Sequence, residues 1–270
     1  MSVSHEVVSY TTRGKFAIIT LNKPSKLNAL TLSEFYDLAN LLREIDERHE
    51  IVVTILTGTG RFFSAGADVS RSPPLSNQDT RRHLLQTFVA GNLYLTRAAA
   101  THSKILVAAL NGPAVGGGAA VAAFADFIYA TPEAYLLLPF ASLGLVAEVG
   151  TSRTLVQRMG ISLANEAMLM GRKISAEELL KCGFLSQIIN AGDNDGDFLA
   201  MVLKELQVLL GDHLSSESML GIKVLLRQPT RDAIDLHNVA EVFAGWGRLA
   251  SGVVDIEFQK IRSGQKRHKL

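Results

Sequence analysis

The chain has 270 residues, 47% of them hydrophobic, and a formal net charge of +1 at pH 7. This length and apolar content are enough to bury a large core in one domain or two, while the near-zero net charge gives no strong field and argues against extended nucleic-acid binding. The single cysteine, Cys182, excludes an intrachain disulfide and a cluster of thiolate metal ligands.

The first sixty residues predict a hairpin, a helix and a buried strand. Residues 7–10 and 16–21 are rich in β-branched and apolar side chains and flank an Arg-Gly turn, as paired strands do. A loop follows, and the helix predicted for residues 31–47 begins with a Thr-x-x-Glu capping box. Residues 51–57 predict a short buried strand.

The middle of the chain predicts alternating helices and strands. A flexible loop is expected over the Pro- and Ser-rich residues 70–78, followed by a helix over residues 80–100. Residues 105–110 predict a strand, after which come an alanine-rich helix ending near residue 124 and a strand over residues 127–130. This alternation is typical of an α/β fold with mainly parallel strands.

The C-terminal part predicts helices. A turn at residues 192–196 is the nearest feature to a boundary, and it divides the chain into an α/β core over residues 1–195 and a helical region over residues 196–270. A second capping box, Ser175 with Glu178, precedes the first of these helices. The predicted helices are 176–181, 197–210, 216–227 and 233–250.

Two segments are built to expose backbone N–H groups. Residues 61–68 and 111–118 are rich in Gly and Ala, and each follows an apolar strand. Small residues let a ligand approach the main chain, and two convergent N–H groups make an oxyanion hole. Either segment alone is equally consistent with a tightly packed turn, but the pair is more specific.

Other kinds of site find little support. The chain has no Gly-x-Ser-x-Gly motif, its seven histidines are scattered without metal-ligand spacing, and it has no Walker A motif. Residues 58–63 half-match a dinucleotide fingerprint, but Phe63 stands where a small residue is required. The apolar residues 105–125 are interrupted by Asn, Gly and Pro, so a buried strand, turn and helix explain them better than a membrane span.

Glu148 is the most suggestive acidic residue. It is the only carboxylate between Glu133 and Glu166, and its neighbours in the chain are mostly apolar. Partial burial there would raise its pKa and make it a better base near neutral pH. The alternative is a helix N-cap or a salt-bridged surface acid beside Gly150, and sequence context alone favours that alternative.

Five motifs together resemble the enoyl-CoA hydratase/isomerase, or crotonase, superfamily. The resemblance implies repeated ββα units in a spiral core, followed by a helical C-terminal trimerisation region, and a homotrimer or a dimer of trimers. It also implies a CoA thioester as substrate, so that CoA is part of the substrate and no separate cofactor is needed. The motifs are residues 26–30, 63–68, 111–117, 126–130 and 143–145.

The resemblance assigns a role to each matching position. The N–H groups of Ala67 and Gly117 would bind the thioester oxygen, and the segments 26–30 and 64–67 would border the CoA nucleotide. Three apolar side chains would line the acyl channel, although ordinary core packing explains them equally well. The implied substrate-binding residues are Lys26, Leu27, Ala29, Ser64, Ala65, Ala67, Asp68, Gly116, Gly117, Phe140, Leu143 and Leu145.

The carboxylates indicate which reaction to expect. Hydratases that this chain resembles carry two glutamates, at positions that here are Ala120 and Phe140. Dienoyl-CoA isomerases keep an acid at the second of these positions, whereas the peroxisomal-type 3-enoyl-CoA to 2-enoyl-CoA isomerases use one glutamate at the position of Glu148. The resemblance therefore predicts a delta(3)-delta(2)-enoyl-CoA isomerase of fatty-acid β-oxidation, with Glu148 moving a proton from C2 to C4.

Two alternatives to that activity remain. One is another CoA-thioester enzyme of the same fold, such as a dienoyl-CoA isomerase or a member serving a specialised pathway. The other is a family member that binds acyl-CoA without turnover.

The last three residues suggest a cellular location. His268-Lys269-Leu270 resembles the peroxisomal Ser-Lys-Leu signal, with His as a departure at its first position. The expected location is the peroxisomal matrix, reached through the import receptor. The alternative is a solvated basic tail on a cytoplasmic protein.

Overall fold

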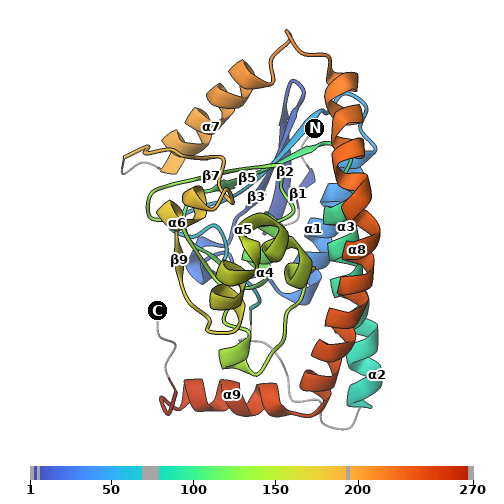
Figure 1. Cartoon of the computed structure of the whole chain (residues 1–270), viewed down its shortest axis with the longest axis vertical. Coiled ribbons are helices and arrows are strands. Elements are labelled where there is room, and N and C mark those ends of the chain that lie inside the picture. The colour runs from blue at the N-terminus through green and yellow to red at the C-terminus, as the bar shows by residue number, and fades with distance from the viewer. Residues whose placement is uncertain (1–2, 5–6, 69–78, 193–194, 267–270) are drawn as a thin grey trace.

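The structure is a computed structural model that describes residues 3–4, 7–68, 79–192 and 195–266 (Figure 1). A twisted sheet of mainly parallel strands forms its centre. The strands of this sheet are β1 (Val3–Ser4), β2 (Val8–Arg13), β3 (Phe16–Leu21), β4 (Val53–Gly58), β5 (Ile105–Leu110), β7 (Phe127–Ala130) and β10 (Gln187–Ile188).

Strand pairing in this sheet follows chain order, and the strands it skips belong to a second, smaller sheet. Among the described residues the order is β1-β2-β3-β4-β5-β7-β10, and only the β1-β2 and β2-β3 pairs are antiparallel. The predicted hairpin and the mainly parallel pairing are thus confirmed. A smaller sheet contains β6 (Ala114–Val115), β8 (Tyr135–Leu137) and β9 (Ile174–Ser175).

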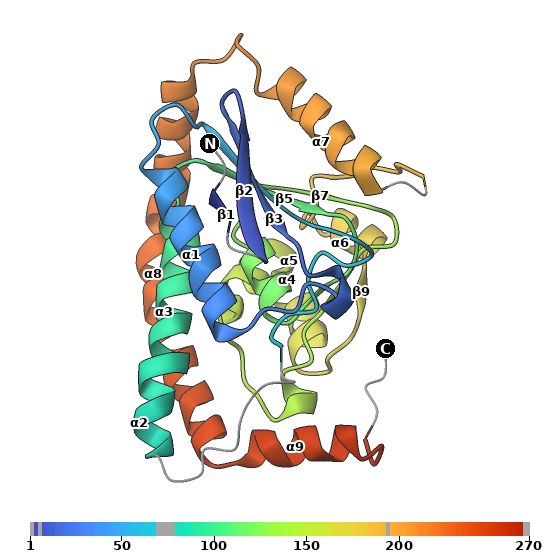
Figure 2. The same cartoon turned by 180° about the vertical axis from the view of Figure 1, so that it is seen from behind.

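Helices cover the sheet and extend beyond it (Figure 2). Short 3₁₀ turns occur at Pro24–Lys26 and Ala141–Leu143, and a π-helical turn at Leu85–Val89. The α-helices are α1 (Leu32–Asp46), α2 (Thr80–Leu84), α3 (Ala90–Thr101), α4 (Gly117–Ala122), α5 (Thr151–Met168), α6 (Ala176–Lys181), α7 (Asp195–Leu209), α8 (Ser216–Ala250) and α9 (Val253–Arg262).

The two faces of the sheet bury different helices. Successive residues of a strand point to opposite faces, so Ile18 and Ile19 of β3 belong to different apolar clusters. Ile19 packs in the cluster that contains Leu42 of α1, whereas Ile18 packs in the cluster that contains Phe198 of α7. Burial on both faces explains the nearly continuous apolar sequence of β4 and β5.

Both predicted capping boxes are present. In α1 the Thr31 Oγ1 accepts a hydrogen bond from the Glu34 N–H at 3.3 Å, and the Thr31 N–H donates to the Glu34 carboxylate at 2.7 Å. The same reciprocal pair joins Ser175 and Glu178 at the start of α6. Each box satisfies two N–H groups that would otherwise lack partners at a helix start.

The prediction of separate helices over residues 216–227 and 233–250 is wrong, because α8 continues through Pro229. Pro229 is exposed, and so is Leu225, whose carbonyl loses its helical partner there and can bind water instead. Ion pairs hold the helix on both sides of the proline. After it, Asp235 pairs with Arg97 of α3, and before it two residues of α8 share one carboxylate. Asp126 pairs with Lys223 at 2.7 Å and with Arg227 at 2.6 Å.

Other differences are smaller. The helix predicted over residues 80–100 is divided into α2, the π-helical turn and α3. The helices α5 and α9 were not predicted, and neither were the short strands of the smaller sheet. The predicted loop at 70–78 and the tail at 268–270 lie outside the described residues, and the boundary at 195/196 stays a prediction. No helix in the described part of the chain is both long and apolar enough to cross a membrane.

Candidate functional site

The two Gly/Ala-rich turns lie directly against each other. The Val115 N–H donates to the Ser64 carbonyl at 2.8 Å. A Cβ atom added at Gly66 would lie 3.3 Å from the Gly117 nitrogen, and one added at Gly118 would lie 2.5 Å from the Ser64 Cβ. The approach of the two main chains therefore requires glycine at both positions.

Two buried amide side chains hold the start of the first turn. The Nδ2 group of Asn28 donates to the carbonyls of Thr59 at 2.9 Å and Phe62 at 2.7 Å. The Nδ2 group of Asn111 donates to the carbonyl of Gly60 at 2.6 Å. Asn28 is fully buried and Asn111 nearly so, which means that both asparagines are structural parts of the site.

The N–H groups of Ala67 and Gly117 are not used within the described part of the turns. Gly117 is the first residue of α4, where a helix has no acceptor for its N–H groups. Ala67 pairs with Leu30 in an isolated parallel bridge that uses the Gly66 carbonyl and the Asp68 N–H, so the Ala67 N–H is left out. Neither N–H donates a hydrogen bond to any residue that the structure describes.

The segment 26–30 borders these turns. The Ala65 N–H donates to the Leu27 carbonyl at 2.8 Å, and the Leu30 N–H donates to the Gly66 carbonyl at 2.8 Å. The Ser64 hydroxyl is buried and donates to the Asn28 carbonyl at 2.9 Å, so its side chain supports the turn. The predicted residues brought together here are Lys26, Leu27, Ala29, Ser64, Ala65, Ala67, Asp68, Gly116 and Gly117.

The three predicted acyl-channel residues lie in one segment after β8, beside the main core. Phe140 is 3% exposed and belongs to the main core, while Leu143 and Leu145 are partly buried. The Leu145 N–H donates to the Phe140 carbonyl at 2.8 Å, which folds this segment back on itself. The Gly116 N–H donates at 2.9 Å to the carbonyl of Leu137, which ends strand β8 just before this segment. The segment is thus tied to the second turn through the main chain.

Glu148 lies in a strained turn before α5. Val149 has a φ of 54° and Gly150 a φ of 70°, and a left-handed conformation is costly for a β-branched residue such as valine. A Cβ atom added at Gly150 would lie 2.9 Å from the ring of Phe124. Phe124 follows α4, the helix that begins at Gly117. The packing therefore connects the Glu148 turn to the helix that presents one free N–H group.

The environment of Glu148 favours its neutral form. The side chain is partly buried, and it makes no ion pair with any residue that the structure describes. Burial and, to a smaller extent, the negative charge of Glu241 raise the pKa of the Glu148 carboxyl from 4.5 to about 7. Gly150 is the N-cap of α5 and has no side chain to cap it. The alternative of Glu148 as an N-cap is therefore wrong, and no residue that the structure describes supplies the partner of a salt-bridged acid.

The sequence prediction missed several residues of the site. Glu241 of α8 accepts the Gly150 and Ser152 N–H groups, and Asn92 of α3 accepts the Val149 N–H at 3.3 Å. The ring of Phe35 lies 3.0 Å from the Cβ position of Gly117. Phe35 had a signal, because it occupies an apolar position on a predicted helix. Glu241 and Asn92 had none that separates them from ordinary surface residues of a helix.

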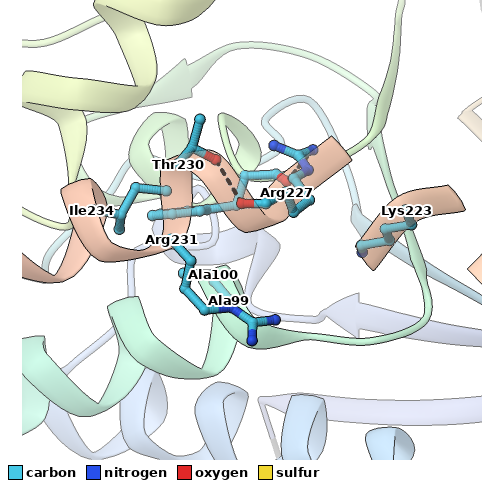
Figure 3. Close-up of a pocket in the computed structure, with 8 residues that line it drawn as sticks. Ala99, Ala100, Lys223, Arg227, Thr230, Arg231 and Ile234 are labelled. Carbon is cyan, nitrogen blue, oxygen red and sulfur yellow. Dashed lines mark hydrogen bonds between the residues drawn. The ribbon is translucent and has the colours of Figure 1, made fainter. Parts of the chain in front are cut away.

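A small cavity lies between α3 and α8, and Lys223, Arg227 and Phe124 are among the residues that line it (Figure 3). Its volume of about 10 Å³ is at the lower limit for one water molecule. Lys223 and Arg227 beside it are already paired with Asp126. Among the described residues there is also no group of three or more His, Cys, Asp and Glu side chains that could hold a metal ion.

Sequence comparisons give relatives over the whole chain. The sequence profile described as "Enoyl-CoA hydratase/isomerase" matches residues 11–208. The chain is 52% identical over 271 residues to a Delta(3,5)-Delta(2,4)-dienoyl-CoA isomerase of Pyricularia oryzae, which covers 96% of this chain and 97% of that protein. It is 35% identical to a 3,2-trans-enoyl-CoA isomerase of Saccharomyces cerevisiae, with 98% of each chain covered.

Solved structures show the same fold. A putative enoyl-CoA hydratase/isomerase from Acinetobacter baumannii superposes with a TM-score of 0.78 at 27% identity, covering 93% of this chain and 99% of that one. An enoyl-CoA hydratase/isomerase from Pseudoalteromonas atlantica superposes with a TM-score of 0.83 at 24% identity, covering 98% and 100%. The resemblance expected from the motifs and the expected fold are both confirmed.

Proposed function

The chain belongs to the enoyl-CoA hydratase/isomerase family, and on that premise we propose that it moves a carbon–carbon double bond of 3-enoyl-CoA to give trans-2-enoyl-CoA. Two of its relatives are enoyl-CoA isomerases by name, which supports isomerisation as the type of reaction. The substrate is the thioester, so CoA serves as its handle and no separate cofactor takes part. A role in fatty-acid β-oxidation belongs to the same proposal.

In this mechanism one carboxylate moves one proton. Glu148 removes a proton from C2, and the negative charge spreads over the thioester oxygen and C4. The N–H groups of Ala67 and Gly117 bind that oxygen, and Glu148 then returns its proton at C4. A base whose pKa is about 7 is suited to both steps near neutral pH, because it accepts and releases a proton with little bias.

The observation that carries this proposal is a single partly buried carboxylate with a raised pKa. Hydration needs a base and an acid, and the positions at which hydratases carry them are here Ala120 and Phe140. Both side chains are apolar and at most 3% exposed. Of these three positions only Glu148 carries a group that can take up a proton, which favours isomerisation over hydration.

A second candidate is isomerisation of a 3,5-dienoyl-CoA to the 2,4-dienoyl-CoA. The relative from Pyricularia oryzae, 52% identical over nearly its whole length, carries that name. In this reaction the proton returns at C6, two carbons farther from C2 than in the first reaction. The second acid expected for such a transfer is replaced by Phe140, so the single-base reaction is the first choice.

The test measures three reactions with the wild type and two variants. Glu148→Gln is expected to lower isomerisation of 3-enoyl-CoA by about 10²–10⁴-fold, which is the usual contribution of a general base. Glu133→Gln, a matched change at an exposed carboxylate, is expected to leave the rate unchanged. Faster turnover of the 3,5-dienoyl-CoA would select the second candidate, and hydration of trans-2-enoyl-CoA would refute an isomerase. Binding of acyl-CoA without any turnover would support the alternative of a family member that binds its ligand and does not catalyse.

A second pair of variants tests the proposed oxyanion hole. Gly117 is the first helical residue of α4, where proline is well tolerated, so Gly117→Pro removes the N–H without breaking the helix. Gly117→Ala is the control, because it adds the same Cβ beside Phe35 and keeps the N–H. The proline variant is expected to be about 10²–10³-fold slower than the alanine variant. Equal rates would argue against the hole.

Assembly and location are further parts of the proposal. Family resemblance supports a homotrimer or a dimer of trimers, and α8 carries exposed apolar side chains suited to such contacts, among them Leu225, Leu226 and Leu236. Sedimentation would measure the oligomer directly. Peroxisomal import through residues 268–270 is tested by deleting Leu270, and unchanged import would remove that part of the proposal.

A further inference from the structure

Glu241 of α8 caps the start of α5 from another helix. Its carboxylate is 6% exposed, and its Oε2 and Oε1 atoms accept hydrogen bonds from the Gly150 and Ser152 N–H groups, each at 2.7 Å. The first N–H groups of a helix need such acceptors, and the positive end of the helix dipole favours a negative charge. Gly150, the N-cap, has no side chain that could supply either.

This contact belongs to the same turn as Glu148. The Glu148 N–H donates to the Thr151 Oγ1 at 3.2 Å, and the Thr151 hydroxyl donates back to the Glu148 carbonyl at 2.8 Å. Asn92 and Glu241 then fix the strained residues Val149 and Gly150 from two further helices. Left-handed backbone persists where surrounding contacts determine it, so the direction of the Glu148 side chain depends on these contacts.

Glu241 is close enough to affect the charge of Glu148. Its negative charge adds to burial in raising the pKa of the Glu148 carboxyl. His237, one turn earlier on α8, places its Nδ1 atom 2.9 Å from the Ser152 Oγ and is the other titratable group at this contact. Further charged groups on the elements around the turn include Arg248 on α8, Arg153 on α5, and Arg97 on α3, which pairs with Asp235 of α8.

We propose that Glu241 is a positioning residue of the isomerase: by binding the Gly150 and Ser152 N–H groups, it holds the turn that carries Glu148 and keeps a negative charge behind that base. This inference rests on the proposed role of Glu148. Glu241 is not a second proton donor, because both of its oxygens already accept main-chain hydrogen bonds and its side chain is nearly inaccessible.

The test compares the pH dependence of kcat/KM for 3-enoyl-CoA in Glu241→Gln and in the wild type. The activity of the free enzyme rises with pH as its base loses a proton. Without the charge of Glu241, Glu148 ionises more readily, so the acidic limb is expected to move from near pH 7 to a lower pH, while burial of Glu148 keeps it above the ordinary 4.5. The rate above that limb is expected to fall about tenfold, because one hydrogen bond to the turn is lost.

Two control variants separate charge from fold. Glu241→Asp keeps the charge but shortens the side chain, so the acidic limb of its kcat/KM profile is expected to stay at the wild-type pH while kcat falls. Glu217→Gln makes the same change at an exposed position of α8, and its profile is expected to match the wild type. An unmoved limb in Glu241→Gln would overturn the inference. If that variant does not fold, wild-type rates in Glu241→Asp would overturn it instead.

Failure of the proposed function gives a different result. An inactive wild type would refute the isomerase, whereas the link between Glu241 and Glu148 can be measured without substrate. The change in stability caused by Glu148→Gln is followed against pH, alone and combined with Glu241→Gln. When Glu241→Gln is also present, the stability change caused by Glu148→Gln is expected to reach its full size at a lower pH than when Glu241 is intact. The same pH dependence with and without Glu241→Gln would overturn the inference.

Discussion

Glu148→Gln is expected to stabilise the folded protein at neutral and alkaline pH, although it removes the proposed base. The carboxyl has a pKa of about 7 in the folded state and an ordinary value of 4.5. Below pH 4.5 this carboxyl is protonated in both the folded and the unfolded state, so the unfolding free energies of the wild type and the variant change with pH in the same way. Between pH 4.5 and 7 the unfolded chain loses this proton and the folded protein keeps it, so wild-type stability falls as pH rises.

The size of the effect follows from these two values. At about 1.4 kcal/mol per pH unit, the interval from 4.5 to about 7 corresponds to about 3 kcal/mol. This is the upper figure, because Glu148 is only partly buried and solvent screens part of the cost. The difference in unfolding free energy, variant minus wild type, should grow over this interval and stay constant above it.

Urea unfolding between pH 4 and 8.5 measures this difference. Trp246, the single tryptophan, donates to the Arg81 carbonyl from α8 and provides a fluorescence signal for loss of the fold. Protein concentration is kept fixed, because assembly changes apparent stability. A pH-independent difference would refute the argument that Glu148 is desolvated.

Glu257→Gln is the opposite control. Hydrogen bonds from Lys260 and Lys266 lower the pKa of Glu257 to about 2. A lowered pKa contributes stability above the ordinary value, and that stability is lost as pH falls through the folded value. Glu257→Gln should therefore destabilise the protein over the range in which Glu148→Gln stabilises it.

Three further substitutions test the scaffold. Asn111→Ala removes hydrogen bonds to the 58–62 loop and should lower the unfolding free energy in urea by about 2–3 kcal/mol; an unchanged value would show that the loop holds itself. Thr31→Ala removes the N-cap of α1 and should cost about 1 kcal/mol in the same assay, and no loss would argue against the capping box. Pro229→Ala restores an N–H within α8 and should raise the thermal midpoint, with a gain in unfolding free energy of at most about 3 kcal/mol; a lower midpoint would mean that the proline stabilises the folded protein.

Much of the fold is predictable because local chemistry and tertiary packing agree. The hairpin of β2 and β3 combines apolar strands with a glycine at φ 56°, and α1 begins where its capping box predicts. The break predicted near Pro229 failed because contacts distant in sequence, such as Lys223 and Arg227 with Asp126, keep the helix continuous. α5 was missed because Gly160, with a φ of 74°, kinks it and interrupts its pattern.

The candidate site was predictable only where it depends on short motifs. The two turns could be found because glycine and alanine recur where main chains must approach, and Glu148 because it is the one acid in an apolar segment. No local pattern identifies Glu241, since a buried carboxylate on a helix has the same sequence signature as an exposed one. Its role depends on the N–H groups of a turn 91 residues away.

That separation has a consequence for the order in which the protein matures. A ribosome adds about 5–20 residues per second, so Glu241 is made roughly 5–20 s after Gly150. The strands from β2 to β7 precede both residues in the chain and can pair before α8 exists. During that interval the turn has no carboxylate to hold it, and the base is still free to move. A nascent chain would therefore pair these strands before Glu241 holds the Glu148 turn. A chain shortened before residue 241 would pair them and lack that contact altogether.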